Sequence, residues 1–283
     1  MNRPLPPPQT GAHHARRKGS RRTLAGLRAL VTGGSSGVGA AVAVELCRCG
    51  VQVLATARRT EALEQVARSA AAAGLSPLRT LAGDITQPNF RAQVVAETRE
   101  LLGGIDIVVA AAGSGAIGPF SSADPQTLRQ IMEIDFFAPA ELVRACLPSL
   151  YESPDPAIVL VGSILGSHPL PLHAEYCAAK SALHSLAGSL RVELAPAGID
   201  VTLARLGPTQ SAFWENLLSG EKPVWSRGPT MTSAAAAATI VAGLRNRRLD
   251  ILPGWTAKGY CFAARFCPRL IDAVVARRLR LSR

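Results

Sequence analysis

The strongest constraint on the fold is a repeated alternation of strand-length apolar runs with longer stretches of helical periodicity. This alternation predicts a parallel sheet that is covered by helices on both faces. We expect strands at 28–32, 51–56, 77–83, 105–110, 157–162, 199–204 and 249–253, and helices at 38–49, 60–73, 88–102, 124–150, 174–195 and 233–246. The predicted fold class is α/β, a doubly wound, Rossmann-type parallel sheet of about seven strands, in which ligands bind at the carboxyl ends of the strands.

The composition is typical of one large domain with a full apolar core. The chain has 283 residues, of which 48% are hydrophobic and 18% charged. Its apolar runs, such as 105-IDIVVAAAG-113, are far shorter than the ~20 residues that span a bilayer. The six cysteines have no Cys-x-x-Cys spacing, and His, Cys and acidic residues show no metal-ligand spacing. We therefore expect no metal site, no disulfide framework and a reducing, cytoplasmic location.

The net charge of +11 is concentrated at the two ends of the chain. Residues 1–22 hold six basic side chains and no acid, and residues 255–283 hold seven basic side chains and one acid. The remaining sequence has 18 basic and 19 acidic residues, a net charge of −1. We expect a disordered basic leader at 1–22 without the apolar region of a secretory signal, a catalytic domain at 23–254 and a C-terminal extension at 255–283. Nucleic acid is not the expected partner.

The C-terminal extension reads as a basic amphipathic helix that is interrupted at Pro268. Apolar residues recur in it at helical spacing, namely Phe262, Phe266, Leu270, Ile271, Val274, Val275 and Leu279. One interpretation is that this apolar face docks on the domain or on another subunit. A second is peripheral contact with an anionic membrane surface. Nucleic-acid binding is a third.

A glycine-rich loop, 32-TGGSSGVG-39, separates the first predicted strand from the first predicted helix. Glycines at 33, 37 and 39 permit a tight turn and a close backbone approach to a pyrophosphate. Ser35 and Ser36 add hydroxyl groups at the start of the helix, where backbone amides and the helix dipole favour an anion. A plain strand-to-helix turn is the alternative, but the position in the fold favours nucleotide binding.

Two arginines end the second predicted strand. An acidic residue there would bind the ribose 2′-hydroxyl of NAD, whereas arginine accommodates the 2′-phosphate of NADP. The sequence has Arg58 and Arg59 and no acid at this place. Guanidinium groups match a phosphate well, so NADP is favoured over NAD. The alternative is that both arginines are solvated at a helix start.

Further short motifs follow the later strands in order. Asp84 lies in 83-GDIT-86, 110-AAAG-113 follows the fourth predicted strand, and 206-LGPTQS-211 follows the sixth. Each motif lies where the carboxyl end of a strand would bring it to the ligand-binding edge of the sheet.

Ser163 follows the fifth predicted strand, and Tyr176 lies 13 residues later. Lys180 is four residues beyond Tyr176, about one helical turn, so both side chains would lie on one helix face. The Tyr–Lys pair alone is a weak signal. With the glycine loop and the motifs above, however, the chain resembles the short-chain dehydrogenase/reductase family, in its single-domain branch, over residues 24–254.

The resemblance implies hydride transfer between a nicotinamide ring and a carbonyl or alcohol carbon. It implies that Tyr176 gives or takes the proton and that Ser163 holds the substrate oxygen. A free phenol has a pKa of about 10, and Lys180 and the oxidised nicotinamide are expected to lower it. The implied cofactor-binding residues are Thr32, Gly33, Ser35, Ser36, Gly37, Val38, Gly39, Arg58, Arg59, Asp84, Ile85, Ala112, Gly113, Tyr176, Lys180, Gly207 and Thr209. Among these, Asp84 matches the family residue that contacts the adenine.

The main departure from the family is Asp135, which stands where the family has a catalytic asparagine that anchors a water in the proton relay. An aspartate also accepts hydrogen bonds from such a water. If it is ionised near Lys180, it should favour the ammonium and partly offset the effect of that ammonium on Tyr176. Alanines also replace both asparagines of the family motif at 110 and 111, and Leu206 replaces a proline.

The segment 208–232 is expected to cover the substrate. It offers apolar side chains for a pocket, namely Phe213, Trp214, Leu217, Leu218, Trp225 and Met231. We expect a small-molecule carbonyl or alcohol substrate of hydrophobic or lipid-like character. The resemblance also implies a homo-oligomer. A nucleotide-binding regulatory protein with little catalysis is the alternative function, because of Asp135 and the missing asparagines.

Overall fold

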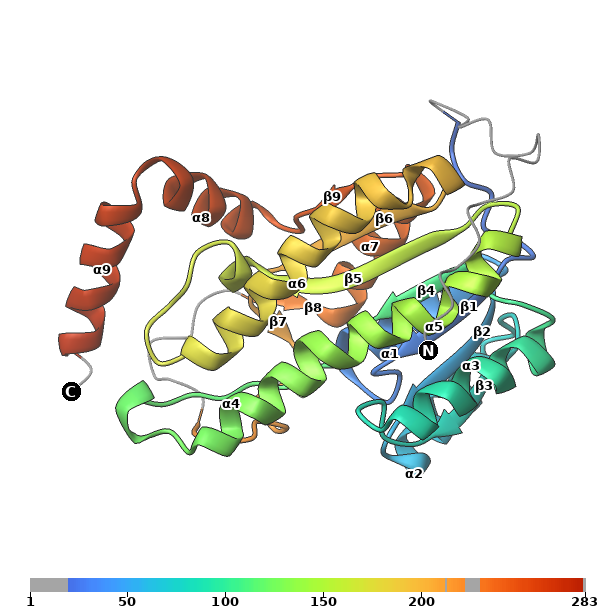
Figure 1. Ribbon diagram of the computed structural model, residues 1–283, viewed down its shortest axis with the longest axis horizontal. Coiled ribbons are helices and arrows are strands. Elements are labelled where there is room, and N and C mark those ends of the chain that lie inside the picture. Colours follow the sequence, from blue (N-terminus) through green and yellow to red (C-terminus); the bar gives the residue numbers. More distant parts are fainter. Residues whose placement is uncertain (1–19, 212, 222–229, 282–283) are drawn as a thin grey trace, which may run out of the picture.

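The computed structural model describes residues 20–211, 213–221 and 230–281 of the chain. Figure 1 shows a central twisted sheet with helices packed on both faces. The sheet is parallel and its strands are ordered β3-β2-β1-β4-β5-β6-β9. The bounds are β1 (Arg28–Thr32), β2 (Gln52–Ala57), β3 (Leu78–Ala82), β4 (Ile107–Ala110), β5 (Ala157–Ser163), β6 (Asp200–Leu206) and β9 (Asp250–Ile251). The predicted doubly wound α/β fold is confirmed.

The helices lie close to their expected places. Those of the main domain are α1 (Gly37–Arg48), α2 (Thr60–Ala72), α3 (Pro88–Leu102), α4 (Pro125–Met132), α5 (Ala138–Glu152), α6 (Ala174–Glu193) and α7 (Ser233–Arg245). Short 3₁₀ turns lie at Phe120–Ser122, Ile164–Gly166 and Ala195–Ala197. A second, two-stranded sheet pairs β7 (Thr209–Gln210) with β8 (Met231–Thr232).

Successive side chains of the strands enter two separate cores, because side chains alternate between the faces of a sheet. In β1, Leu30 belongs to the core beneath α3, α5 and α6, while its neighbour Val31 belongs to the core beneath α1 and α7. Both side chains are fully buried. Burial on both faces explains why the strands are continuous apolar runs.

The long helix expected at 124–150 differs from the prediction in one local feature. A π-helical turn, Glu133–Phe137, lies between α4 and α5, and Asp135 is fully buried within it. Turns of this kind are rare and occur often at functional sites.

The C-terminal extension forms two helices, α8 (Trp255–Phe266) and α9 (Pro268–Leu281), that meet at Cys267. They lie outside the helical layers of the main domain (Figure 1). Among the described residues, none of the helices combines the length and apolar character that crossing a bilayer requires.

Arg22 belongs to the folded domain, although the leader was expected to include it; residues 1–19 lie outside the described part. Its guanidinium is fully buried, 3.1 Å from Asp155 and 2.8 Å from Asp200. Arg247 pairs with the same carboxylates at 2.8 and 2.7 Å. The Arg22 side chain also donates to the carbonyl of Leu244. This network attaches the segment before β1 to the start of β6 and to the C-terminal end of α7.

We expect the Arg22→Ala substitution to lower the free energy of unfolding by about 3 kcal/mol, because it removes one partner of a buried ion-pair network. Urea denaturation measures the change. The neighbouring Arg21 is exposed and provides the matched control, since Arg21→Ala should have little effect. Equal effects of the two substitutions would contradict the structural role of Arg22.

Candidate active site

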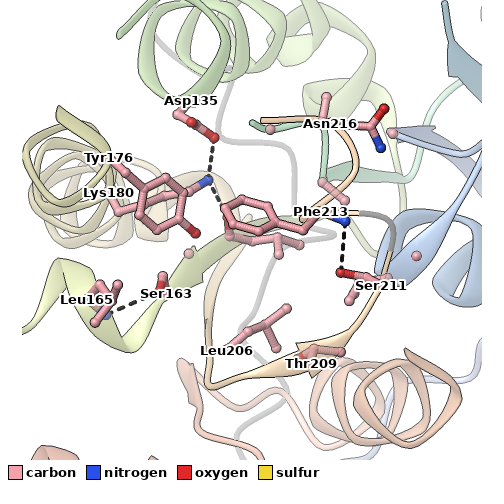
Figure 2. Close-up of a pocket in the computed structure, with 18 of the residues that line it drawn as sticks. Asp135, Ser163, Leu165, Tyr176, Lys180, Leu206, Thr209, Ser211, Phe213 and Asn216 are labelled. Carbon is pink, nitrogen blue, oxygen red and sulfur yellow. Dashed lines mark hydrogen bonds and ion pairs between the residues drawn. The ribbon is translucent and has the colours of Figure 1, made fainter. Parts of the chain in front are cut away.

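A cavity of about 590 Å³ lies at the carboxyl ends of the central strands. The segments that follow β1, β2, β3, β4, β5 and β6 line it, together with residues of α6, α8 and α9. The cavity therefore occupies the place where a doubly wound fold binds its ligand. Figure 2 shows the side chains around its centre.

The loop between β1 and α1 has a geometry that only glycine satisfies. Gly33 and Gly37 have φ angles of +71° and +59°, in the left-handed region. A Cβ atom on Gly33 would lie 2.8 Å from the carbonyl oxygen of Ala111, and one on Gly39 would lie 2.3 Å from the carbonyl oxygen of Gly33. The loop thus presents bare backbone at the start of α1, and this arrangement fits a pyrophosphate.

Thr32 joins the end of β1 to the end of β4. Its Oγ1 accepts hydrogen bonds from the backbone amides of Ala111 and Ala112, each at 3.1 Å. The side chain is 2% exposed and also borders the cavity. Its contacts fix the relative positions of the glycine loop and of the segment that contains Gly113.

The end of β2 brings two exposed arginines to the cavity. Arg58 and Arg59 both line it. Arg59 Nη2 donates to Ser36 Oγ at 2.7 Å and to Ser35 Oγ at 3.4 Å. Ser36 lines the cavity and Ser35 does not. Of the expected cofactor residues, Ser35 is the one that lies outside the cavity wall.

After β3, Asp84 and Ile85 border the same end of the cavity. Asp84 Oδ1 accepts hydrogen bonds from the backbone amide and the hydroxyl of Thr86, at 3.0 and 2.8 Å. This short turn holds the carboxyl group at the cavity wall. The other expected cofactor residues, Val38, Gly39, Ala112, Gly113, Gly207 and Thr209, also line the cavity.

At the centre of the cavity, Lys180 forms a buried ion pair with Asp135. Lys180 Nζ lies 2.8 Å from Asp135 Oδ1, and the two side chains are 6% and 0% exposed. The ammonium also donates to the carbonyl of Val161 at 3.3 Å and lies 5.7 Å from the centre of the Tyr176 ring. Both Tyr176 and Lys180 extend from α6 on the same side, and Asp135 faces the ammonium from the π-helical turn (Figure 2).

Ser163 is the last residue of β5 and lies on the side of the cavity that holds Tyr176 and Lys180 (Figure 2). Its Oγ accepts a hydrogen bond from the amide of Leu165 at 3.2 Å, and its side chain also hydrogen-bonds Tyr176. Three of the four expected catalytic residues, Ser163, Tyr176 and Lys180, therefore lie close together. All three line the cavity together with Asp135.

The pKa of Tyr176 differs from the sequence-based expectation. Burial raises the pKa of this phenol above its usual value, and the nearby carboxylate of Asp135 raises it further. Lys180 and the hydrogen bond with Ser163 lower the pKa of Tyr176, but by less. For Lys180, burial lowers the pKa, but Asp135 and Tyr176 outweigh this effect and raise it. The ammonium is thus stabilised mainly by Asp135, as expected.

The end of the cavity beyond Tyr176 is apolar and aromatic. The Phe213 ring meets the Tyr176 ring edge-on at 5.5 Å and the Trp214 ring at 5.4 Å. Of the side chains expected to cover a substrate, Phe213 and Trp214 line the cavity, whereas Leu217, Leu218 and Met231 do not. Trp225 lies outside the described residues.

The sequence did not identify the contribution of the C-terminal helices to this end. Tyr260 of α8 and Ile271, Val274 and Val275 of α9 line the cavity. Tyr260 Oη donates to the carbonyl of His168 at 3.2 Å, and His168 Nε2 lies 3.2 Å from Asp272. The signal for these residues is the helical spacing of apolar side chains after 260, for which docking on the domain or on another subunit is one of the interpretations given above.

Comparison with known proteins indicates the same family as the sequence motifs. The family model described as "short chain dehydrogenase" matches residues 28–222. The "Hydroxysteroid 11-beta-dehydrogenase 1-like protein" of Xenopus tropicalis is 34% identical over 263 residues, with 90% of this chain and 88% of the relative covered. The human "17-beta-hydroxysteroid dehydrogenase type 1" is 30% identical over 203 residues, which cover 70% of this chain and 61% of the relative.

The solved structure of a short-chain dehydrogenase from Streptomyces avermitilis is also similar. It has a TM-score of 0.76 and 27% identity, and the match covers 91% of this chain and 99% of that structure. The sequence match, the sheet order and the fold similarity agree. The chain belongs to the short-chain dehydrogenase family, whose members are NAD(P)-dependent oxidoreductases that act on CH–OH and C=O groups.

Proposed function

We propose that this protein uses NADPH to reduce a hydrophobic ketone or aldehyde. The observation that carries the proposal is the single cavity that joins Arg58 and Arg59 at one end to an aromatic wall at the other, with Ser163, Tyr176 and Lys180 between. Membership of an oxidoreductase family favours this function over a regulatory nucleotide-binding protein.

The dinucleotide would lie along the strand ends, where it would be held by the glycine loop, Asp84, Ile85 and the segment at Gly113. When bound, the nicotinamide supplies the hydride in reduction and accepts it in oxidation. Tyr176 gives its phenolic proton to the carbonyl oxygen in reduction and takes the hydroxyl proton in oxidation. Ser163 donates a hydrogen bond to the same substrate oxygen and positions the reacting carbon.

Lys180 and Asp135 set the charge around Tyr176. The ammonium favours the phenolate, and the carboxylate opposes it. The protonated phenol is the form that donates a proton to a carbonyl, and the phenolate is the form that takes the hydroxyl proton in oxidation. The opposed effects of Lys180 and Asp135 on the pKa of Tyr176 therefore set the pH range in which each direction is favoured.

NADP is favoured because both arginines at the end of β2 line the cavity. A 2′-phosphate carries charge that bidentate guanidinium groups bind well. Arg59 is also held in place by the hydroxyl of Ser36 at 2.7 Å. The cofactor phosphate would thus meet a partly preorganised site.

A hydrophobic substrate is favoured by the composition of the other end of the cavity, where Phe213, Trp214, Tyr260 and Val275 form the wall. The names of the two hydroxysteroid dehydrogenase relatives are consistent with a large apolar substrate. The homo-oligomer and the cytoplasmic location stay predictions. The second rests on the cysteine pattern, and all six cysteines are free in the structure.

The Tyr176→Phe substitution removes the proposed proton donor and keeps the ring. We expect turnover of an apolar ketone to fall by about 10²–10⁴-fold, while NADPH affinity, measured by nicotinamide fluorescence, changes little. Tyr151→Phe on α5 is the matched control and should retain activity. Turnover of the Tyr176→Phe variant within a few-fold of the unmodified protein would contradict the assignment.

Replacing Arg58 and Arg59 by alanine removes the proposed 2′-phosphate site. Since hydrogen bonds to charged groups contribute about 1.5–3 kcal/mol, the Kd for NADPH should rise roughly 10–100-fold, and the Kd for NADH should change little. Titration calorimetry measures both constants. Arg68→Ala, farther along α2, is the control. Parallel weakening of both cofactors would argue against a 2′-phosphate contact.

The Asp135→Asn substitution removes the carboxylate that raises the pKa of Tyr176. The pKa of Tyr176 should fall. The pH at which reduction declines and the pH at which oxidation rises should then both move to lower values. The pH profile of kcat/KM measures this shift. Glu133→Gln removes a partly exposed charge, which lies 3.8 Å from Arg91, from the same π-helical turn and should leave the profile in place. An unchanged profile in Asp135→Asn would exclude the proposed tuning.

A further inference from the structure

The α8–α9 pair presents an exposed apolar surface. Its large side chains are Trp255, Phe262, Phe266, Leu270 and Val274, which are between 45% and 86% exposed. The rings of Phe262 and Phe266 pack together at 4.7 Å. Several large apolar side chains exposed on one pair of helices are typical of an interaction surface. We call this set the outer apolar surface.

Basic side chains accompany the outer apolar surface. Lys258, Arg265, Arg269 and Arg277 are exposed on the same two helices. The sole acid of residues 255–283 is Asp272, which lies 3.2 Å from His168. Exposed aromatic side chains and a strong positive charge together match a partner whose interior is apolar and whose surface is negatively charged.

The same two helices have a second face, which borders the substrate end of the cavity. Tyr260, Ile271, Val274 and Val275 line the cavity wall. Val274 lines the cavity and is also 45% exposed, so it is shared by the cavity wall and the outer apolar surface. The two surfaces are therefore adjacent at α9. Figure 1 shows the pair at the edge of the molecule, outside the main helical layers.

Charge distinguishes the candidate occupants of this surface. A second copy of the chain would bring two strongly basic segments together, and like charges across an interface oppose association. A nucleic acid would pair with the arginines but would leave an apolar surface beside the mouth of an apolar cavity without a role. An anionic lipid surface accommodates both the charges and the aromatic groups.

We propose that the α8–α9 pair docks on an anionic lipid bilayer, and that the apolar substrate passes from the bilayer into the cavity beside Val274. The second part rests on the proposed function. Docking places the cavity mouth against the phase in which an apolar ketone is concentrated. The arginines attract the lipid headgroups, and the aromatic side chains enter the interface.

Co-sedimentation with phosphatidylcholine vesicles, with and without phosphatidylserine, tests the docking. We expect the full chain to bind the phosphatidylserine vesicles and to be released by salt. Reversing two charges, with Arg265→Glu and Arg269→Glu, should weaken binding by at least about tenfold. The matched control reverses Arg68 and Arg99 on α2 and α3, which changes the net charge equally and should bind like the unmodified chain.

A second variant tests the apolar contribution independently. Phe262→Ser with Phe266→Ser should also weaken vesicle binding, although it leaves every charge in place. Neither residue lines the cavity, so kcat/KM for a small water-soluble ketone should be unchanged. The same variants should lose turnover of a long-chain ketone held in phosphatidylserine vesicles.

Docking is overturned if the full chain does not bind phosphatidylserine vesicles, if the α2–α3 control loses binding as much as the α8–α9 variants, or if the surface mediates dimers or binds an oligonucleotide instead. Entry from the bilayer is overturned if the variants lose vesicle binding but still reduce the vesicle-held ketone at the original rate. Failure to reduce any ketone, with vesicle binding intact, would refute the proposed function and leave docking supported.

Discussion

The strand order of the parallel sheet is the constraint on which the site depends. β1 pairs with β2 on one side and with β4 on the other, so the connections that follow β1 and β4 lead away from each other. A crevice opens between them at the carboxyl ends. Thr32 fixes its two walls by accepting hydrogen bonds from the amides of Ala111 and Ala112. The glycine loop and the Ser163–Tyr176–Lys180 group face each other across that crevice only because the sheet has this order.

A second constraint is the buried ion pair between Lys180 and Asp135. Removing two charges from water is costly, and a separation of 2.8 Å offsets the cost only together with further hydrogen bonds. The carbonyl of Val161 provides one for the ammonium, and the amide of Ser114 lies 3.5 Å from the carboxylate. The π-helical turn brings Asp135 to this position. Its charge makes the phenol of Tyr176 harder to ionise, so local helix geometry is linked to the proton chemistry of the site.

Much of the fold and of the site was predictable because both depend on local patterns. The apolar runs predicted the strands, and the glycine loop lies between the first strand and the first helix, as predicted. The spacing from Ser163 to Tyr176 and Lys180 identified side chains that the structure brings together. Ser35 does not line the cavity whereas Ser36 does, a difference between two neighbouring serines of a tight turn that depends on backbone dihedral angles and is not visible in the sequence.

Other features required the tertiary structure. The buried pairing of Arg22 depends on Asp155 and Asp200, which are distant in sequence. Lys180 lowers the pKa of Tyr176 as expected, but burial raises it by more in the protein alone, and the burial of this side chain could not be read from the sequence. The role of Tyr260 and Val275 in the cavity wall was missed because amphipathic spacing shows that a face is apolar, not what it contacts.

The proposed chemistry is hydride transfer beside Tyr176, Ser163 and Lys180, at the middle of one continuous cavity. Transfer of deuterium from the two C4-deuterated forms of NADPH to a panel of apolar ketones tests it most directly, with the label located in the alcohol product by mass spectrometry. We expect one of the two forms, and not the other, to place deuterium on the carbinol carbon. Oxidation of NADPH without label in any alcohol, or no turnover across the panel despite tight NADPH binding, would contradict it.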